Sequence, residues 1–592
     1  MDTFYCMEQK QHMAFPYRQR FILLVDVGQE TWEKIPLSES ESKTMLGGRL
    51  LALGLWDKYA EYENLGSQAY ESGNPIVIAA GSASDISLAC CDSFTLVTRS
   101  QLTGQLSVNT SNGPLARALH GCGYSAMVIV GRFRRLSGFE IDFNSVQFSN
   151  AEKFHDFTTK EVATHFLGKN LIALGPAGEH QVPYASIWSD GTNFGRGGVG
   201  TVFGLKNIKY ITLAPSVSGR ESYDPKQLGT TIQKYQRTLQ KSKVGDLIAK
   251  EGSVTLIEQA NRYGWAAVDC FSLRRDGRLW GLSSYRDFKA ADPAVQGCAG
   301  CPNGCAHSSG EGSVFPDFSM GLALGANLEL FDYQSVSLLM DRCSETGLDY
   351  YSIGAVLAWA RKTRPEGTLS FLPDLSRATV HQYLHLIDAM AYRKGTGEQL
   401  SHTLDKLVTL YGGAEYAYAV NSIPLAPYDL RALPAQALLT ALGDDTVVIR
   451  ELLSGNHYRR GKERQIAMWA MFSQDLRYAM ESLGLCYFFS LPCFDKPFLW
   501  YPFRFYRKSM FSFFAELVSV TEGYTVTGKQ VASYGRDAWA LQRKIDKMLL
   551  KGEPVGTLPD QVLVNASSNF PAAQVVPLAR LLDTYYQMRG IK

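Results

Sequence analysis

This sequence lacks the features of membrane, secreted and nucleic-acid-binding proteins. It has no run of 18 apolar residues, and no apolar segment with a small-residue cleavage site opens the chain. The 59 Lys and Arg residues nearly balance 57 Asp and Glu residues, so the net charge of +2 gives no nucleic-acid footprint. Eleven cysteines are an odd number, which argues against a secreted disulfide framework. We therefore expect a cytoplasmic protein with no membrane span.

Low-complexity tracts, basic tails and long polar linkers are also missing, so the 592 residues can form about three or four domains with large cores. Over residues 20–215, short β-branched or aromatic runs alternate with Gly, Ser, Asn and Asp clusters, which predicts a β-rich domain. Strands are expected at Phe21–Val27, Ile76–Ala80, Phe94–Thr98, Ala126–Val130 and Tyr210–Leu213.

From about residue 216 onward the apolar pattern becomes helical. Val336, Leu339, Met340 and Cys343 recur at the spacing of one helix face, and Gly347 is placed to end that helix. The sequence therefore predicts an α+β fold. Its expected domains are a β-rich one over residues 1–215, a helical one over 216–415 and a second helical one over 416–592.

The most informative motif is a group of three cysteines in the loop GCAGCPNGCAHSSG. Cys298, Cys301 and Cys305 have the C-x2-C-x3-C spacing that can hold three corners of a four-iron cluster, and Cys486 can supply the fourth ligand. Four further residues allow the loop to turn tightly: Gly297, Gly300, Pro302 and Gly304. A zinc site that adds His307 and reduced cysteines without metal are the alternatives. The sequence has no second C-x2-C or H-x3-H pair for zinc, which favours the cluster.

The remaining cysteines are scattered, and we interpret them as buried apolar residues: Cys6, Cys90, Cys91, Cys122, Cys270, Cys343 and Cys493.

A small pattern is repeated in the helical part. SETGLDYYS and ESLGLCYFFS each follow a predicted helix and place Asp349 or Cys486 directly after Gly-Leu. One such copy is ordinary helix termination. Two copies, one of which ends in a predicted cluster ligand, indicate equivalent loops on either side of one cofactor.

A glycine-rich run, FGRGGVGTVFG, contains G-x-G-x-x-G between Gly195 and Gly200. A dinucleotide site would also need a preceding strand, a long helix and an acidic residue about 20 positions later in a β-α-β unit. A β-like segment at 210–213 follows too soon, so we expect no such site. The run could bind a phosphate through backbone N–H groups with Arg196 and Lys206, or form a plain turn between strands.

Taken together, these segments resemble the aldehyde:ferredoxin oxidoreductase family of tungsten, occasionally molybdenum, bis-pyranopterin enzymes. The resemblance covers most of the chain and keeps the order of the motifs, which makes it far more specific than any single motif. The matching segments are Leu46–Arg49, Thr98–Gly104, Gly123–Ala126, Gly175–Glu179, Gly195–Lys209, the loop with Cys298, and residues 347–354, 417–432 and 472–486.

The resemblance implies a β-saddle N-terminal domain that carries two pterin dithiolenes, with their phosphates bridged by Mg2+. Two helical domains would close over the metal, the two Gly-Leu loops would hold the pterins, and a [4Fe-4S] cluster with Cys298, Cys301, Cys305 and Cys486 would carry electrons out. Matched residue by residue, the cofactor-binding positions are Asn109, Asn193, Gly195, Arg196, Gly197, Asp349 and Leu485.

Several family positions are altered in this chain. Ser93 stands where the family has an arginine between pterin and cluster, and in the family's PEYET segment Asp317 keeps an acid while Ser319 replaces the second one. A family histidine near the metal falls where this chain has Asp444, Asp445 and Thr446. The general acid–base candidates are therefore Asp317, Asp444 and Asp445.

The resemblance implies oxidation of a small aldehyde to a carboxylate, with electrons passed to ferredoxin or a small iron–sulfur subunit. Two alternatives stay open: low-potential reduction of an activated acid or another acceptor with the same cofactor, and a non-catalytic iron–sulfur electron-transfer subunit. A homodimer is one oligomeric state to test. The aromatic run Phe488–Phe514 is either core or interface packing, or a funnel for an apolar substrate.

Overall fold

The computed structural model describes the greater part of the chain. The described residues are 19–65, 70–84, 90–143, 145–215, 225–240, 242–283, 294–295, 298, 301, 304–308, 315–455, 461–494, 503–552, 556–564 and 575–591. Four residues discussed above lie outside this set: Cys6, Gly297, Gly300 and Pro302.

Two six-stranded sheets with the same connectivity form the N-terminal part. The first has the strand order β2-β1-β6-β3-β4-β5, and the second, from its matching edge, β8-β7-β12-β9-β10-β11. Each contains one parallel pair, β1 with β6 and β7 with β12, among antiparallel neighbours. The first sheet consists of β1 (Arg20–Asp26), β2 (Thr31–Leu37), β3 (Ile76–Ala80), β4 (Ser93–Arg99), β5 (Leu106–Asn112) and β6 (Ala126–Val130). The second consists of β7 (Ser137–Ile141), β8 (Val146–Asn150), β9 (Asn170–Leu174), β10 (Ile187–Ser189), β11 (Thr192–Phe194) and β12 (Ile208–Leu213).

The two sheets share one hydrophobic core. Leu23 and Phe94 of the first sheet and Phe139 and Ile172 of the second belong to the same cluster of buried side chains. Strands rich in Val, Ile and Phe pack well in such an interior because branched and aromatic side chains fit a pleated surface. The five predicted strands are present, and their bounds agree with β1, β3, β4, β6 and β12 to within two residues.

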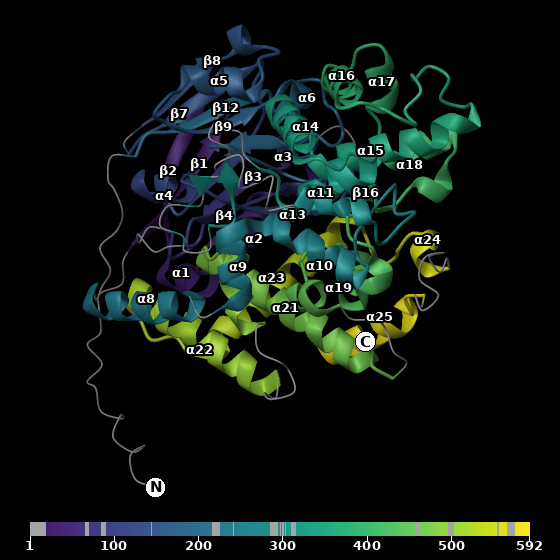
Figure 1. Ribbon diagram of the computed structural model, residues 1–592. Coiled ribbons are helices and arrows are strands. Elements are labelled where there is room, and N and C mark those ends of the chain that lie inside the picture. The colour runs from purple at the N-terminus through teal and green to yellow at the C-terminus, as the bar shows by residue number, and fades with distance from the viewer. Residues whose placement is uncertain are drawn as a thin grey trace.

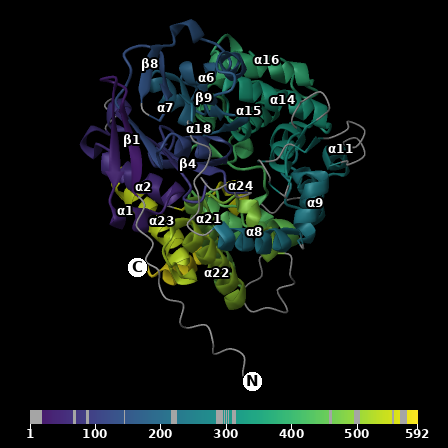
Figure 2. The ribbon, with the colours of Figure 1, turned by 90° about the vertical axis from the view of Figure 1, so that its left-hand side faces the viewer.

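The rest of the chain is mainly helical, which confirms the predicted fold class (Figure 1). Helices α14 (Tyr333–Thr346) and α15 (Tyr350–Thr363) lie on the side of the second sheet, whereas α21 (Glu463–Leu483) and α23 (Gly528–Leu549) lie below the first (Figures 1 and 2). The other long helices are α8 (Pro225–Gln240), α9 (Lys243–Glu251), α10 (Leu256–Tyr263), α16 (Val380–Ala391), α18 (Leu404–Tyr411), α19 (Pro434–Ala441), α22 (Phe503–Glu522) and α25 (Leu578–Arg589). The boundary at residue 415 between two helical domains stays a prediction.

One helix of the N-terminal part was not expected from the sequence. Helix α2 (Gly48–Tyr59) packs between the first sheet and helices α21 and α23. Its leucines at 50, 51, 53 and 55 are all buried. A helix that is apolar on every side has no amphipathic period, so no helical pattern in the sequence predicts α2.

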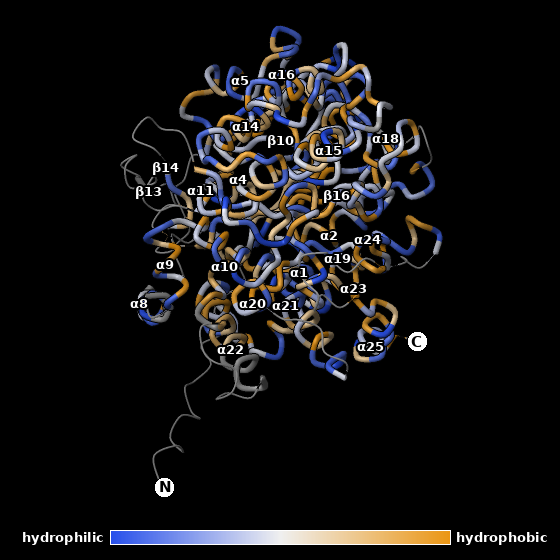
Figure 3. The backbone as a smooth tube through the Cα atoms, turned by 45° about the vertical axis from the view of Figure 1, so that its right-hand side comes forward, coloured by the Kyte–Doolittle hydropathy of each residue, from blue (hydrophilic) through white to orange (hydrophobic). Residues whose placement is uncertain are grey.

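Hydrophobic segments recur through the interior of the molecule, and hydrophilic segments gather on its outside (Figure 3). Part of the aromatic run Phe488–Phe514 belongs to the core. Phe489, Phe511 and Phe514 are buried there with residues of α21 and α23. Its residues 495–502 lie outside the described residues. No helix in the described part of the chain is long and apolar enough to cross a membrane.

Candidate cofactor-binding and redox site

The two Gly-Leu loops have the same backbone geometry and attach to equivalent strands. Helix α14 ends at Gly347 with φ 75°, and α21 ends at Gly484 with φ 86°, a left-handed conformation that suits glycine. The Gly347 carbonyl accepts a hydrogen bond from the Ser186 N–H at 2.8 Å, and the Gly484 carbonyl accepts one from the Ser93 N–H at 3.1 Å. Ser186 directly precedes β10 and Ser93 begins β4, its counterpart in the first sheet.

Each loop also packs on a glycine that follows an equivalent strand. A Cβ atom on Gly81, after β3, would lie 2.0 Å from the Gly484 Cα atom. A Cβ atom on Gly175, after β9, would lie 2.5 Å from the carbonyl carbon of Thr346. A larger residue at either glycine would therefore push the loop off the sheet. The two loops are therefore equivalent in their backbone contacts with the two sheets, as expected. That they bind one cofactor stays a prediction.

The predicted cluster ligands come together from the three-cysteine loop and the end of α21. Burial raises the pKa of Cys298 to about 11, and Cys301 adds to this effect. Burial likewise raises the pKa of Cys305 to about 12, with contributions from Cys301 and Cys298. The pKa of Cys486 is raised by burial and then by Cys305, Cys298 and Cys301. The four thiols thus act on one another electrostatically although Cys486 is distant in sequence.

Four half-buried thiols acting on one another fit the donor set of a four-iron cluster, since iron binds thiolates and so offsets the cost of deprotonating them. His307, the alternative zinc ligand, is buried, and burial lowers its pKa. The set of four thiols stays a prediction.

A fifth cysteine lies beside this group, and the sequence interpretation missed it. The Sγ atom of Cys90 is 3.0 Å from the Sγ atom of Cys301. Cys90 is buried, has a φ of 65°, and its carbonyl accepts a hydrogen bond from the Cys486 N–H at 2.9 Å. Cys90 is buried in the hydrophobic core, as the sequence interpretation expected, but that interpretation did not foresee its contact with Cys301. The available signal was its position next to Cys91 and Asp92, in the segment where the family arginine is missing.

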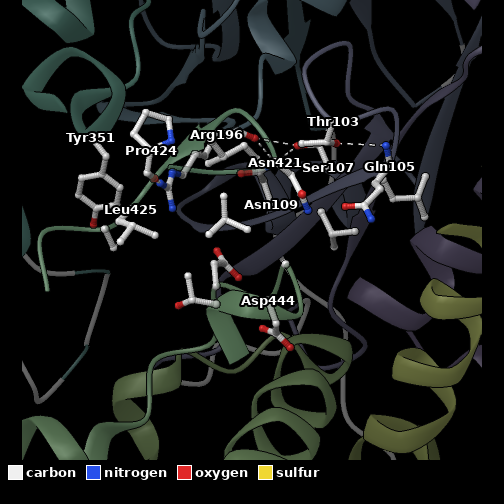
Figure 4. Close-up of a pocket in the computed structure, with 18 of the residues that line it drawn as sticks. Thr103, Gln105, Ser107, Asn109, Arg196, Tyr351, Asn421, Pro424, Leu425 and Asp444 are labelled. Carbon is white, nitrogen blue, oxygen red and sulfur yellow. Dashed lines mark hydrogen bonds between the residues drawn. The ribbon is translucent and has the colours of Figure 1, made fainter. Parts of the chain in front are cut away.

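A cavity of about 160 Å³ with both polar and apolar lining lies between the first sheet and the helical part (Figure 4). Its wall includes Asn109 on β5, Arg196 from the glycine run, and Asp444 and Asp445 after α19. The Asn109 side chain donates a hydrogen bond to the Arg196 carbonyl at 3.1 Å, and the Ser107 hydroxyl donates one at 2.7 Å. These contacts fix the backbone of the glycine run against β5.

Two arginines line the cavity together with Asp444 and Asp445. The Arg196 guanidinium lies over the Tyr351 ring at 5.1 Å, and its Nε is buried without a hydrogen-bond partner among the described residues. The Arg49 guanidinium pairs with Glu481 at 2.7 Å, and its own Nε is also unpartnered among these residues. Buried N–H donors without partners are rare in native proteins, so each arginine has a donor available to an anion.

The two adjacent aspartates of the cavity have different surroundings. The Asp444 carboxylate accepts hydrogen bonds from the Thr446 N–H at 2.7 Å and the Tyr478 hydroxyl at 2.9 Å. Asp445 pairs with Arg477 at 3.0 Å. Burial acts to raise the pKa of Asp445, but Arg477, Arg49 and Arg196 outweigh it and lower the pKa. Asp445 is therefore favoured as a carboxylate with a cationic partner, whereas Asp444 accepts hydrogen bonds from neutral donors.

Asp317, the third acid–base candidate, does not line this cavity. Its Oδ1 atom caps helix α13 (Phe318–Met320) by accepting a hydrogen bond from the Met320 N–H at 2.8 Å. The same atom accepts a hydrogen bond from the Ser319 hydroxyl, which in turn accepts one from Tyr351. Asp317 is connected to the cavity through those two hydroxyls, because Tyr351 does line it.

The remaining predicted cofactor residues lie in the two loops, on β11 and in the glycine run. The Asn193 side chain donates to the Leu348 carbonyl at 2.8 Å, and Asp349 caps α15 and lies 3.9 Å from the Arg196 Nε atom. Gly195 and Gly197 have positive φ values on either side of Arg196, and Leu485 is fully buried next to Cys486.

Lys206 does not belong to the anion site, because its buried ammonium donates to the Gly131 carbonyl at 2.7 Å. The glycine run also leads into the seven-residue helix α7 (Val199–Leu205) and then β12, which is not a neighbour of β11 in the sheet. This arrangement confirms that the run is not a dinucleotide-binding unit.

Two family descriptions match the chain almost end to end. "Aldehyde ferredoxin oxidoreductase, N-terminal domain" matches residues 22–215, and "Aldehyde ferredoxin oxidoreductase, domains 2 & 3" matches residues 230–592. The chain belongs to the aldehyde ferredoxin oxidoreductase family. The resemblance seen in the sequence is thereby confirmed, and the family is one of oxidoreductases.

The chain is also similar to curated proteins of this family whose names describe them as tungsten-containing. It is 26% identical to the tungsten-containing aldehyde ferredoxin oxidoreductase of Pyrococcus furiosus, and the match covers 93% of both chains. The protein of the same name from Thermococcus kodakarensis is 25% identical over 93% of both chains. Among solved structures, the active site complex BamBC of benzoyl coenzyme A reductase has a TM-score of 0.76 at 16% identity, and the match covers 97% of this chain and 95% of that one. At that identity the structural match shows a shared fold alone.

Proposed function

We propose that this chain is a tungstopterin, or molybdopterin, iron–sulfur oxidoreductase that oxidises an aldehyde to a carboxylate. The observation that carries the proposal is the end of helix α21. There Leu485 lies in a loop equivalent to the one that contains Asp349. The next residue, Cys486, lies near the thiols of the three-cysteine loop, which act on it electrostatically. A cofactor held between the two loops would therefore adjoin a group of thiols suited to an electron-transfer cluster.

The cluster would be held by Cys298, Cys301, Cys305 and Cys486 as a [4Fe-4S] centre. Its role would be to accept electrons one at a time and pass them to ferredoxin or a small iron–sulfur subunit. Curated relatives at about 25% identity are named ferredoxin oxidoreductases, which supports an iron–sulfur acceptor. A second copy of the chain as a homodimer partner and a cytoplasmic location belong to the same proposal.

The pterin cofactor would occupy the cavity and contact the two Gly-Leu loops. The unpartnered Nε–H groups of Arg196 and Arg49 support binding of its phosphates there. When bound, a metal dithiolene of this kind supplies two-electron chemistry at the metal. Mg2+ between the phosphates would be coordinated near the residues expected from the family: Asn109, Asn193, Gly195, Arg196 and Gly197. Asp349 and Leu485 would contact the two pterins from the loops.

The carboxylates of the chain would order the substrate and hold protons. Asp445, whose pKa is lowered, would act as an ionised acceptor that fixes donors or cations in the cavity. Asp444 would orient Tyr478 and keep that wall rigid, since its oxygens already accept three hydrogen bonds. Asp317 would take part in proton transfer from a position outside the cavity.

Elemental analysis of the full chain, purified without oxygen from cells supplied with tungstate and molybdate, tests this proposal. We expect about four irons and about one tungsten or molybdenum per chain, and reduction of benzyl viologen by aldehydes. Zinc without iron would contradict it, and four irons without the heavier metal would favour an electron-transfer subunit. Holoenzyme that oxidises reduced viologen with an activated acid, and is inert to aldehydes, would favour the reductive alternative.

A further inference from the structure

Three oxygen atoms form a continuous hydrogen-bonded chain that begins at the cavity wall. The Tyr351 hydroxyl donates to the Ser319 Oγ atom at 2.7 Å, and the Ser319 hydroxyl donates to the Asp317 Oδ1 atom at 2.6 Å. Both distances lie in the normal range for O–H···O hydrogen bonds. Each donor in the chain points away from the cavity and toward the carboxylate.

The three residues span from the cavity to a less enclosed part of the molecule. Tyr351 projects from α15 into the cavity wall (Figure 4). Ser319 is buried, with 3% of its surface exposed, and Asp317 is half-buried and acts electrostatically on Cys305. The chain therefore links the cavity to the neighbourhood of the three-cysteine loop.

Helix capping alone does not explain this arrangement. The cap of α13 is complete once the Met320 N–H reaches Asp317. Neither Ser319 nor the Tyr351 hydroxyl is needed for it. Burial, and next Tyr351 and Asp317, raise the pKa of Tyr428, so a fourth polar side chain adjoins this network in a buried wall of an apolar core. Buried polar networks are costly unless every member is satisfied, which indicates a role for this one.

We propose that Tyr351, Ser319 and Asp317 form a proton relay that removes protons from the cavity. The inference rests on the proposed function, because oxidation of an aldehyde with water yields a carboxylic acid, two protons and two electrons. The electrons leave through the iron–sulfur acceptor. The relay takes a proton and no electrons.

The atoms of one transfer balance along the chain. A proton from the water or substrate in the cavity bonds to the Tyr351 oxygen while the Tyr351 hydrogen moves to Ser319. The Ser319 hydrogen moves in the same way to the Asp317 carboxylate. Three O–H bonds break and three form, and Asp317 then releases its proton toward solvent. Serine and tyrosine suit this role because a hydroxyl donates and accepts at once.

The surroundings keep Tyr351 protonated between transfers. Burial, and next the negative charge of Asp317, raise the pKa of Tyr351, whereas Arg196 opposes them. The other groups that face it are Tyr428 and Asp349. A tyrosine that stays neutral is ready to pass a proton on without first losing its own.

The test uses the full metal-loaded enzyme with three variants and a control. Tyr351→Phe and Ser319→Ala each break the chain, whereas Ser319→Thr keeps the hydroxyl. The matched control is Tyr383→Phe on α16, a buried tyrosine whose hydroxyl donates to the Leu328 carbonyl and does not line the cavity. Iron and tungsten are counted in every sample, so that loss of cofactor is separated from loss of proton transfer.

Reduction of the enzyme by an aldehyde is followed in a stopped-flow instrument, with a pH indicator in weak buffer, in H2O and D2O. We expect Tyr351→Phe and Ser319→Ala to lower kcat by about 10- to 100-fold with KM changed less than about 2-fold, since positioned proton transfer contributes rate factors of this order. The solvent isotope effect should rise in both variants, proton release should lag behind reduction, and Ser319→Thr should recover most of the rate. Tyr351→Phe with wild-type rate and isotope effect would overturn the relay.

A second measurement needs no substrate. The holoenzyme is reduced and reoxidised electrochemically, and the carboxylic C=O stretch that disappears in Asp317→Asn is followed by infrared difference spectroscopy. We expect Asp317 to change its protonation with the redox state in the wild-type enzyme and not in Ser319→Ala. Absence of that change in the wild-type enzyme refutes the relay, while its presence in an enzyme inert to aldehydes refutes the proposed substrate and keeps the relay.

Discussion

The Sγ atom of Cys90 lies 3.0 Å from that of Cys301, although 211 residues separate them in the chain. The same residue contacts Cys486 through its carbonyl oxygen, so Cys90 adjoins ligands from both halves of the predicted cluster site. Five sulfur-bearing residues thus meet where four are needed for a cubane. Cys90 occupies the position of a neighbour that can donate a hydrogen bond to a ligand sulfur.

Replacing Cys90 should leave the iron count unchanged and alter the electronic properties of the cluster. Cys90→Ala should lower the reduction potential, because a hydrogen bond to a ligand thiolate stabilises the more negatively charged reduced cluster. Redox titration followed by electron paramagnetic resonance measures this shift. A variant with half the wild-type iron would instead identify Cys90 as a ligand.

Cys486→Ala should remove one of the four ligands and with it most of the cluster. We expect iron and acid-labile sulfide to fall to less than about half of the wild-type content, with loss of visible absorption, since a cubane is held by four thiolates. Cys122→Ala is the control, because Cys122 is a buried thiol in the core between the two sheets. Full iron and an unchanged spectrum in Cys486→Ala would remove this residue from the ligand set.

Arg196→Gln should weaken cofactor binding without affecting the cluster. The change removes the positive charge whose unpartnered Nε faces the cavity, and charge-assisted contacts to phosphate are the strong ones. The tungsten or molybdenum content should drop at least about 5-fold while iron stays near the wild-type value. Arg278→Gln, at an exposed ion pair with Asp276, is the matched control. Equal losses of both metals would point to misfolding instead.

Gly484→Ala should destabilise the protein by about 3 kcal/mol, because it combines strain at positive φ with overpacking. An added Cβ atom would lie 2.3 Å from the Ser84 Oγ atom and 3.0 Å from the Gly81 Cα atom. Gly367 has a similar φ of 90° with no atom within 4 Å of the added Cβ, so Gly367→Ala should cost about 1 kcal/mol. Urea unfolding of both variants measures the loss of unfolding free energy and separates overpacking from strain at positive φ. Equal losses in the two variants would show that the loop tolerates displacement.

Asp546→Asn should make the protein more stable at pH 8 and little different at pH 4. Burial raises the pKa of Asp546 on α23 to about 7, while its carboxylate accepts a hydrogen bond from the Leu106 N–H. The pKa is higher in the folded than in the unfolded state, so the contribution of this group is fully present below about pH 4 and is lost as the pH rises through about 7. The loss amounts to at most about 4 kcal/mol.

Thermal unfolding of this variant and the wild-type protein between pH 4 and 8 measures the difference. The exposed Asp583→Asn on α25 is the control and should show no such trend. A constant gap between Asp546→Asn and wild type across this range would show that Asp546 stays ionised in the folded protein.

The sequence by itself determined the fold class, the family and the positions of five strands. Runs of β-branched or aromatic residues and an apolar period of three to four residues are local signals, and they predicted β1, β3 and α14. The C-x2-C-x3-C spacing is equally local and gave three of the four predicted cluster ligands. Ordered motifs along the whole chain identified the family, because many matches in one order do not arise by chance.

Only the tertiary structure decided which distant residues meet. In it, Cys90 contacts Cys301, and Lys206 binds the Gly131 carbonyl and not the predicted anion site. Asp317 is connected to the cavity through Ser319 and Tyr351. The structure also showed that the two sheets repeat one topology, and that each holds one Gly-Leu loop. These relations depend on packing between segments far apart in the chain, and local sequence patterns carry no information about which of them will be in contact.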